Sequence, residues 1–121
     1  MNVYTGYFYR YGEYIKKGLY PISISLSTPP GINCNNYIAL APTWSILNEY
    51  KNNGGDRLLY SQRYNNEILA KLSADSVIND LKLLSGDKDV ILLCYEKPFS
   101  FCHRQLVAKW LENNGFVCRE Y

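Results

Sequence analysis

The sequence has little net charge, no long apolar run and no basic segment followed by an apolar one at its start. Its 13 Lys and Arg residues nearly balance its 11 Asp and Glu residues, which leaves a formal charge of +2. This balance predicts no strong attraction to nucleic acid or to an anionic membrane. The apolar runs are too short to span a bilayer, and Met1–Gly6 does not resemble a signal peptide. We therefore expect a cytoplasmic protein that does not enter membranes.

Cysteines are few, and no two of them form a C-x-x-C pair. They are Cys34, Cys94, Cys102 and Cys118. In a reducing compartment we expect no disulfide framework. A structural zinc site normally has paired ligands at short spacing, and Cys102–His103 is one adjacent pair without a second. The sequence therefore predicts neither a metal site nor a cofactor.

The remaining composition is that of a globular protein. A length of 121 residues fits one domain, and 47% hydrophobic with 20% charged residues is ordinary for a folded chain. The chain has 12 Tyr and 12 Asn but few Ala residues, a bias that favours an AT-rich genome, such as that of a low-GC bacterium or one of its phages. Tyr rings offer flat surfaces that stack on bases or sugars, although we expect most of them to be half-buried.

Apolar periodicity predicts alternating strands and helices. The apolar run Val90–Tyr95 is typical of a strand buried on both faces in the centre of a parallel sheet. Gly6 indicates a bulge or a close approach by another group. We expect a single Rossmann-like α/β domain over residues 1–121, with a mostly parallel sheet flanked by helices. The predicted strands are 3–9, 22–26, 90–95 and 116–118. The predicted helices are 43–52, 58–72, a third that ends at residue 84, and 105–113. Asp75 or Ser76 is the predicted cap of the third helix, and Leu84 is among the residues expected to face inward.

The segment from Cys94 to Arg104 carries the residues best suited to chemistry. It leaves the carboxyl end of the predicted central strand and enters the last helix, which is where ligands bind in open α/β sheets. Glu96 supplies an acid in the loop. The helix start supplies the thiol, imidazole and guanidinium of Cys102, His103 and Arg104. Free N–H groups favour an anion there, and the same field favours the Cys102 thiolate.

Structural roles compete with these chemical ones. In one interpretation Arg104 pairs with Glu96, and the ion pair fixes the loop. Cys102 is then a small buried residue at the helix entry, and Cys94 is inert core. Because consecutive residues on a helix do not face one another, Cys102 and His103 are not expected to form a nucleophile–base pair.

The same segment resembles the signature of the Domain of Unknown Function 488 family. Members of that family pair an L-C-x-E strand end with a C-H-R helix start, and this chain has Leu93–Glu96 followed by Cys102–Arg104. Thr5–Tyr7 is similar to the T-x-G strand of the family, and Tyr64 and Leu69 fit its helix. The resemblance implies a compact Rossmann-like domain but no particular activity. Many members carry Asp-Val-Arg after the second strand, where this chain is uncharged, and this departure favours binding without reaction.

Three function classes fit these features, and the first is a binding protein. It would hold a nucleotide-like or other phosphorylated small molecule at the carboxyl edge of the sheet, and would sense or sequester a nucleotide signal as phage counter-defence proteins do. The anion would lie at the last helix start, and Tyr7, Tyr9 or Tyr37 would stack on the base. Ser23 and Ser25 would bind ribose or phosphate. The predicted ligand-binding residues are Thr5, Gly6, Tyr7, Tyr9, Ser23, Ser25, Tyr37, Glu96, Cys102, His103 and Arg104.

The second class is an enzyme that acts on a nucleotide or nucleoside. Glu96 would be its acid, base or nucleophile, and Cys102 an alternative nucleophile. Phosphatase, Walker A and G-x-G-x-x-G loops are absent from the sequence. The third class is a nucleic-acid or protein interaction domain. Its candidate surface is a basic patch of Arg10, Lys16, Lys17 and Arg63. The sequence also leaves open whether the chain forms a homo-oligomer.

Overall fold

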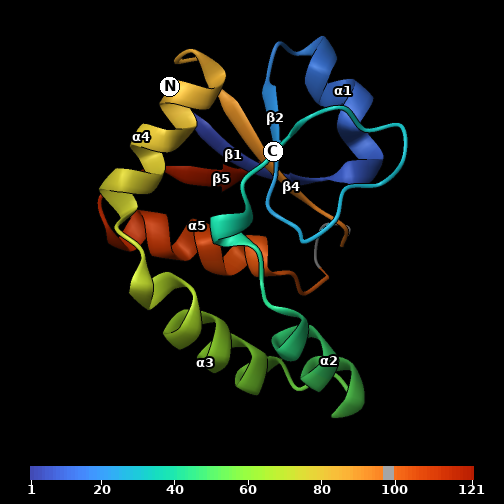
Figure 1. Ribbon diagram of the computed structural model, residues 1–121. Helices are drawn as coiled ribbons and strands as arrows, with labels where there is room; N and C mark the ends of the chain where they lie inside the picture. The colour runs from blue at the N-terminus through green and yellow to red at the C-terminus, as the bar shows by residue number, and fades with distance from the viewer. Residues whose placement is uncertain (97–99) are drawn as a thin grey trace.

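The computed structural model describes residues 1–96 and 100–121 and shows an α/β sandwich (Figure 1). Within these residues, five parallel strands form one sheet in the order β3-β2-β4-β1-β5. The strands are β1 (Val3–Tyr7), β2 (Tyr20–Ser23), β3 (Asn35–Asn36), β4 (Val90–Cys94) and β5 (Cys118–Glu120). The helices are α1 (Tyr11–Lys16), α2 (Trp44–Asn52), α3 (Arg57–Glu67), α4 (Ala74–Ser85) and α5 (His103–Asn113), with short 3-10 turns η1 (Phe8–Arg10), η2 (Ile38–Leu40) and η3 (Leu69–Lys71).

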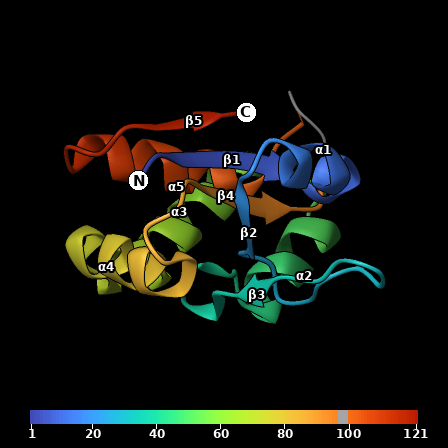
Figure 2. The ribbon, with the colours of Figure 1, turned by 90° about the horizontal axis from the view of Figure 1, so that it is seen from above.

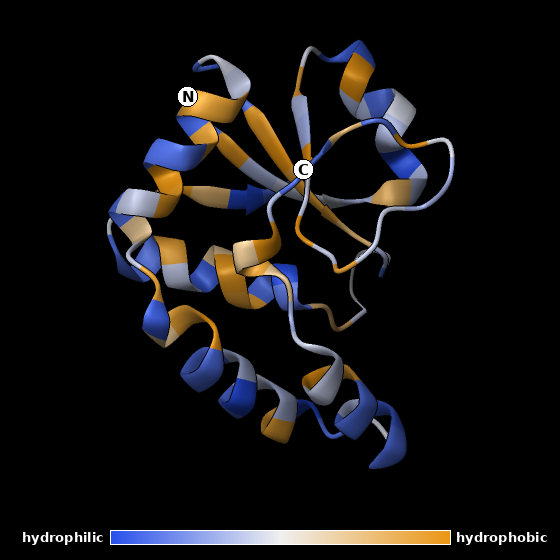
Figure 3. Ribbon diagram, in the orientation of Figure 1, coloured by the Kyte–Doolittle hydropathy of each residue, from blue (hydrophilic) through white to orange (hydrophobic). Residues whose placement is uncertain are grey.

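Strand β4 is the centre of the sheet. Val90 is in register with Val3 of β1 on one side and with Tyr20 of β2 on the other, and both pairings are parallel. All five residues of β4 are buried, and its ribbon is among the most apolar in the molecule (Figure 3). The prediction of a central parallel strand from the run 90–95 is confirmed, because only a strand covered on both faces needs side chains that are apolar throughout.

The two faces of the sheet carry separate layers of helix. Side chains alternate along a strand, so Ile91 and Leu93 pack with Phe8 and Tyr14 beneath α1. Leu92 belongs to the larger cluster on the opposite face, to which α3, α4 and α5 contribute. Figure 2 shows α3 and α5 behind the sheet and α1 apart from them, at the end of β1. None of the described helices is long and apolar enough to cross a membrane.

Side-chain caps set where three helices begin. Thr43 accepts a hydrogen bond from the Ile46 amide at the start of α2, and Asp56 accepts one from the Leu59 amide at the start of α3. Ser73 caps α4, so the prediction that Asp75 or Ser76 would be the cap is wrong. The Ser73 hydroxyl satisfies one of the amides that a helix start leaves unpaired.

Other boundaries differ from the sequence predictions for local reasons. The first strand stops at Tyr7, because Phe8 begins η1, and the polar stretch after it forms α1. The second strand ends at Ser23, where the serine hydroxyl accepts the Ser25 amide and turns the chain. Leu84, predicted to face inward, is exposed. The segment 32–42 contains β3 and η2, and the last strand is 118–120 instead of 116–118.

Gly6 lies where the backbone of β1 meets an aromatic ring. A Cβ added at Gly6 would lie 2.5 Å from the Tyr14 hydroxyl oxygen and 2.8 Å from Cδ1 of Ile91. That hydroxyl also accepts a hydrogen bond from the Tyr7 amide. The close approach predicted at Gly6 is therefore made by a side chain of α1.

We expect Gly6→Ala to destabilise the fold by about 1–3 kcal/mol, the usual cost of overpacking a filled site. The matched control is Gly12→Ala, since a Cβ at Gly12 meets nothing within 4 Å. Gly12 is an exposed helical position, so its replacement should stabilise by up to about 1 kcal/mol. Urea unfolding of the two variants measures both effects, and equal stabilities would contradict the packing at Gly6.

Candidate functional site

A cavity of about 460 Å³ opens at the carboxyl ends of β2 and β4. This edge is where ligands bind in parallel α/β sheets. Loop residues after the two strands, one side of α2 along its length, the start of α5 and one residue of α3 surround it. Its floor is formed by Cys94, Cys102 and His103. Its polar groups outside the floor include Ser25, Ser27, Lys51, Tyr95 and Glu96.

One wall of the cavity is aromatic. It consists of Trp44 and Tyr50 from α2, Tyr60 from α3, and Phe101 before α5. The Tyr60 and Phe101 rings meet edge to face at 5.1 Å, and the Tyr50 and Tyr60 rings at 5.3 Å. Such pairs hold one another in fixed orientations. The sequence shows Trp44 and Tyr50 at helical spacing, a signal equally typical of core packing, and so does not single them out as site residues.

Arg63 holds α2 and α3 together behind this wall. Its Nη1 lies 3.3 Å from Glu49 Oε1 on α2, and its Nε lies 2.6 Å from Glu67 Oε2 on α3. A further nitrogen donates to the Ser45 hydroxyl at 3.1 Å. The guanidinium thus links the two helices that carry most of the aromatic wall.

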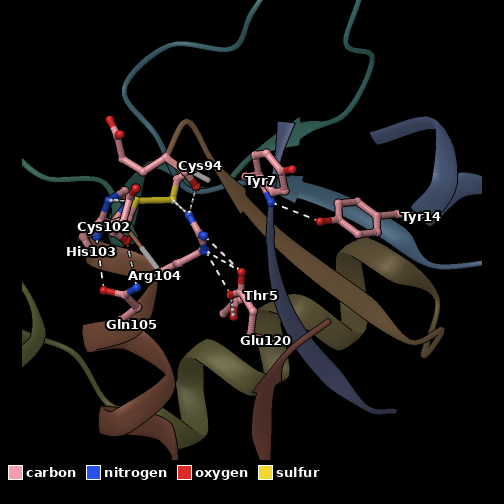
Figure 4. A network of polar contacts seen from close by, with 11 residues as sticks. Thr5, Tyr7, Tyr14, Cys94, Cys102, His103, Arg104, Gln105 and Glu120 are labelled. Atoms are coloured by element: carbon pink, nitrogen blue, oxygen red, sulfur yellow. Dashed lines mark hydrogen bonds and ion pairs between the residues drawn. A yellow bond between two sulfur atoms is a disulfide. The ribbon is translucent and has the colours of Figure 1, made fainter. Parts of the chain in front are cut away.

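On the floor, Cys94 and Cys102 are joined by a disulfide (Figure 4). Two sequence predictions are therefore wrong at this pair. Cys94 is buried, but it is not inert core, because its sulfur bonds Cys102 and accepts a hydrogen bond from Arg104. A disulfide was not expected either. The spacing of eight residues conceals the pair in the sequence, and only the return of the chain from β4 into α5 brings the sulfurs together.

His103 contacts Cys102 directly, contrary to the expectation for consecutive residues. Its Nδ1 lies 3.6 Å from the Cys102 sulfur. Cys102 is the residue before the helix and has extended backbone angles, so the helical argument against a contact does not apply to it. The expectation that the two side chains do not face one another is wrong for that reason, and the expectation that they do not form a nucleophile–base pair stays a prediction.

The protonation of His103 follows from its surroundings. Burial lowers the pKa of His103 to about 4, and the charge of Arg104 acts in the same direction. The ring is therefore neutral near pH 7. Its Nε2 lies 2.6 Å from the carbonyl oxygen of Ile24, which can only accept a hydrogen bond, so the proton lies on Nε2. Nδ1 carries a free lone pair and faces the sulfur.

Arg104 is fully buried and is held by protein groups on all sides. Its Nε and Nη2 each lie 3.0 Å from a carboxylate oxygen of Glu120. Its Nη1 donates to the Cys94 sulfur at 3.0 Å and to the carbonyl oxygen of Glu96. The predicted ion pair between the Arg104 and Glu96 side chains is thus replaced by a backbone contact, and the carboxylate comes from Glu120.

Glu120 was missed because it lies at the end of the chain, in a strand that the sequence placed two residues too early. Its carboxylate also accepts a 2.6 Å hydrogen bond from the Thr5 hydroxyl of β1. Thr5 and Glu120 are partners in the parallel register of β1 and β5. Two neighbouring strands therefore supply the groups that anchor Arg104 (Figure 4).

The cavity brings together four of the predicted ligand-binding residues, namely Ser25, Glu96, Cys102 and His103. The others do not line it. Thr5 and Arg104 belong to the Glu120 network, Gly6 packs against Tyr14, and Ser23 is buried. Tyr7 stacks with the exposed Tyr9 at 6.2 Å, and Tyr37 donates a hydrogen bond to Asp80.

The predicted basic patch is divided between separate parts of the molecule. Arg10 forms an ion pair with Glu13 beside α1, where Lys16 and Lys17 also lie. Arg63 belongs to α3 and is paired with Glu49 and Glu67. Figure 1 shows α1 and α3 at opposite ends of the molecule.

Fold and site define a Rossmann-like α/β protein with a sulfur–imidazole floor under an aromatic cavity. Residues 22–115, well over half of the chain, match the family model described as the Active DUF488-N3 subclade. The chain belongs to the DUF488 family. The match includes the whole segment from Cys94 to Arg104 but neither Thr5 nor Glu120. No curated protein and no solved structure matches the chain.

We expect Arg104→Ala to destabilise the fold by about 3 kcal/mol, because it leaves the Glu120 carboxylate without its partner. The value is at the low end for a broken buried pair, since the Glu120 side chain is 38% exposed. Arg119→Ala, which removes an exposed cation from the same strand, is the control and should change stability little. Thermal unfolding compares the variants, and an unchanged melting temperature for Arg104→Ala would contradict the network.

Proposed function

We propose that the protein binds a small molecule carrying a nucleobase, and that the base enters the cavity at the carboxyl ends of β2 and β4. The observation that carries this proposal is the aromatic wall of the cavity, with polar groups close to it. A base offers a flat ring for stacking and edge groups for hydrogen bonds. A volume of about 460 Å³ lies in the usual range for small-molecule sites.

The aromatic residue best placed to stack on a ligand is Trp44. Its side chain is 60% exposed although it lines the cavity. Tyr60, by contrast, is buried, and burial raises the pKa of its hydroxyl. Stacking on the Trp44 ring would remove apolar surface from water at a place where the fold itself leaves it uncovered.

The polar groups suit the remaining parts of a nucleotide. The Glu96 carboxylate accepts N–H groups of a base or hydroxyls of a ribose, and the Ser25 hydroxyl both donates and accepts. Lys51 is the cation that lines the cavity among the described residues. It replaces Arg104 as the group that would attract a phosphate, because the Arg104 guanidinium is occupied by Glu120, Cys94 and the Glu96 carbonyl.

The role that we propose for such binding is to sense or sequester a nucleotide signal in the cytoplasm, as phage counter-defence proteins do. What supports this role is a binding cavity in a Rossmann-like fold, which is an analogy of fold. The Tyr- and Asn-rich composition fits a phage or a low-GC host as the source.

Trp44→Ala should weaken nucleotide binding about 5- to 150-fold, the equivalent of about 1–3 kcal/mol for one stacked base. The chain has two Trp residues, so the fluorescence of a Trp110→Phe variant comes from Trp44 alone. We titrate this variant with purine and pyrimidine nucleosides and with their phosphates. We expect quenching by at least one nucleotide and weaker binding in Lys51→Ala for phosphorylated ligands only. An unquenched signal throughout the panel would contradict the proposed site.

An enzyme acting on a nucleotide or nucleoside is the second candidate. The observation that favours it is the contact between the Cys102 sulfur and the unprotonated Nδ1 of His103, at 3.6 Å. Once the disulfide is reduced, the Cys102 thiol lies on the cavity floor with its S–H beside Nδ1, where its sulfur can act as a nucleophile toward a bound ligand. Glu96 at the cavity would then serve as acid or base. The subclade whose family model the chain matches is described as active, and this description supports an enzyme.

Mass analysis of ligands separates the two candidates. The reduced protein is incubated with a nucleotide pool and the small molecules are compared before and after. Recovery of an unchanged ligand, retained equally by wild type and Cys102→Ser, is the result expected of a binding protein. New product masses that disappear in Cys102→Ser or in Glu96→Gln would identify an enzyme and assign the group.

A further inference from the structure

We propose that, when the Cys94–Cys102 pair is reduced, Cys94, Cys102 and His103 bind one zinc ion on the cavity floor, with the fourth position open to the cavity. The two sulfurs and a ring nitrogen of His103 all lie within 4.8 Å of one another, and all three residues are buried. Two Cys and one His with an open position is a known form of catalytic zinc site. This proposal does not depend on the nucleotide site.

The spacing of one sulfur and one nitrogen ligand already fits a tetrahedral ion. With Zn–S and Zn–N bonds of about 2.3 and 2.05 Å, sulfur and nitrogen ligands lie about 3.6 Å apart. The Cys102 sulfur and His103 Nδ1 lie 3.6 Å apart in the structure. The Cα atoms of Cys94 and Cys102 are separated by 7.4 Å, wider than the usual range of about 4.4–6.8 Å for a disulfide. An ion between the two sulfurs accommodates this wider spacing.

The surroundings of His103 already have the form found around metal-bound histidines. Such a ligand usually donates its other ring N–H to a carbonyl or carboxylate, which fixes the tautomer and the ring orientation. Here Nε2 donates to the Ile24 carbonyl. Nδ1 presents its lone pair to Cys102, which lies beside it in Figure 4. The imidazole is thus oriented for an ion at Nδ1.

The charges also balance around a divalent ion. Two thiolates, one Zn²⁺, the Arg104 guanidinium and the Glu120 carboxylate sum to zero. The Arg104 N–H that now points at the Cys94 sulfur would hydrogen-bond the zinc-bound thiolate and help to hold it. Without the ion, two thiolates would face a single buried guanidinium, which is costly in a low-dielectric interior.

Formation of the site requires a reductant. A dithiol transfers two electrons and two protons to the Cys94–Cys102 disulfide and is itself oxidised to a cyclic disulfide. Zn²⁺ then binds both sulfurs and releases the two thiol protons to solvent. The same floor would therefore exist either as a disulfide or as a zinc site, and Cys102 bound to zinc would not act as a nucleophile.

The test uses Co²⁺ as a spectroscopic probe for the full-length chain. The chain is reduced with a dithiol, freed of metal and excess reductant without oxygen, and titrated with Co²⁺. We expect one Co²⁺ per chain, thiolate-to-cobalt charge-transfer absorption, the strong visible bands of a tetrahedral ion, and displacement by one equivalent of Zn²⁺. Absence of thiolate-to-cobalt absorption in the reduced chain would overturn the proposal.

Two comparisons locate the ion. Cys94→Ser, Cys102→Ser and His103→Gln should each lower metal affinity more than about 100-fold, since loss of even an outer partner costs about 10–100-fold. Cys34→Ser is the matched control, because Cys34 is a free cysteine outside the cluster, and it should keep the spectrum. A spectrum lost in Cys34→Ser, or kept in Cys94→Ser, would overturn the assignment.

The wild-type chain in two redox states provides the same comparison without any variant that could fail to fold. The oxidised form, identified by a mass lower by two hydrogens, keeps Cys34 and Cys118 as thiols but not the pair on the cavity floor. It should give no thiolate-to-cobalt absorption. Equal absorption from the two forms would show that the ion binds elsewhere and would overturn the proposal.

Discussion

The buried guanidinium of Arg104 is the constraint on which the rest of the site depends. It lies in the first turn of α5, contacts the sulfur of Cys94 and the carbonyl of Glu96 at the end of β4, and pairs with Glu120 on β5. A buried cation needs such partners, since an unpaired charge in the interior is strongly unfavourable. The end of β4, the Glu96 carbonyl and the start of α5 are therefore held in one position relative to the sheet edge.

The position of α5 in turn decides which groups reach the cavity. With Arg104 turned toward β5, the preceding residues Cys102 and His103 face the cavity at the ends of β2 and β4. His103 is fixed a second time by the Ile24 carbonyl beyond β2. The chemical groups of the C-H-R motif are thus divided between two tasks. The guanidinium holds the helix to the sheet, and the Cys102 sulfur and the His103 imidazole line the cavity.

This division explains how much the sequence could predict. The apolar run of β4 and the Thr43 start of α2 are encoded locally, by residue type and spacing, and those predictions are confirmed. The disulfide joins Cys94 and Cys102, which are eight residues apart in the sequence. Glu120 comes close to Arg104 only because β5 pairs with β1 in a register that sequence spacing does not show. The aromatic wall is a third case, because Trp44 and Tyr50 at helical spacing have the pattern of core residues until α3 and Phe101 are placed beside them.

Burial of the cavity floor determines the charge state of the groups that form it. Burial keeps His103 neutral at the pH of a cell by lowering its pKa, so the lone pair on Nδ1 carries no proton and can coordinate an ion. The same burial makes a free thiolate pair costly unless a cation lies beside it, and Arg104 supplies one positive charge there. A disulfide removes both negative charges, and a divalent ion neutralises them. Since Cys94 and Cys102 both line the cavity, either state changes the charge and the coordinating groups that a ligand in the cavity would meet. The redox state of one cysteine pair is therefore coupled, through buried charge, to the chemistry of the cavity above it.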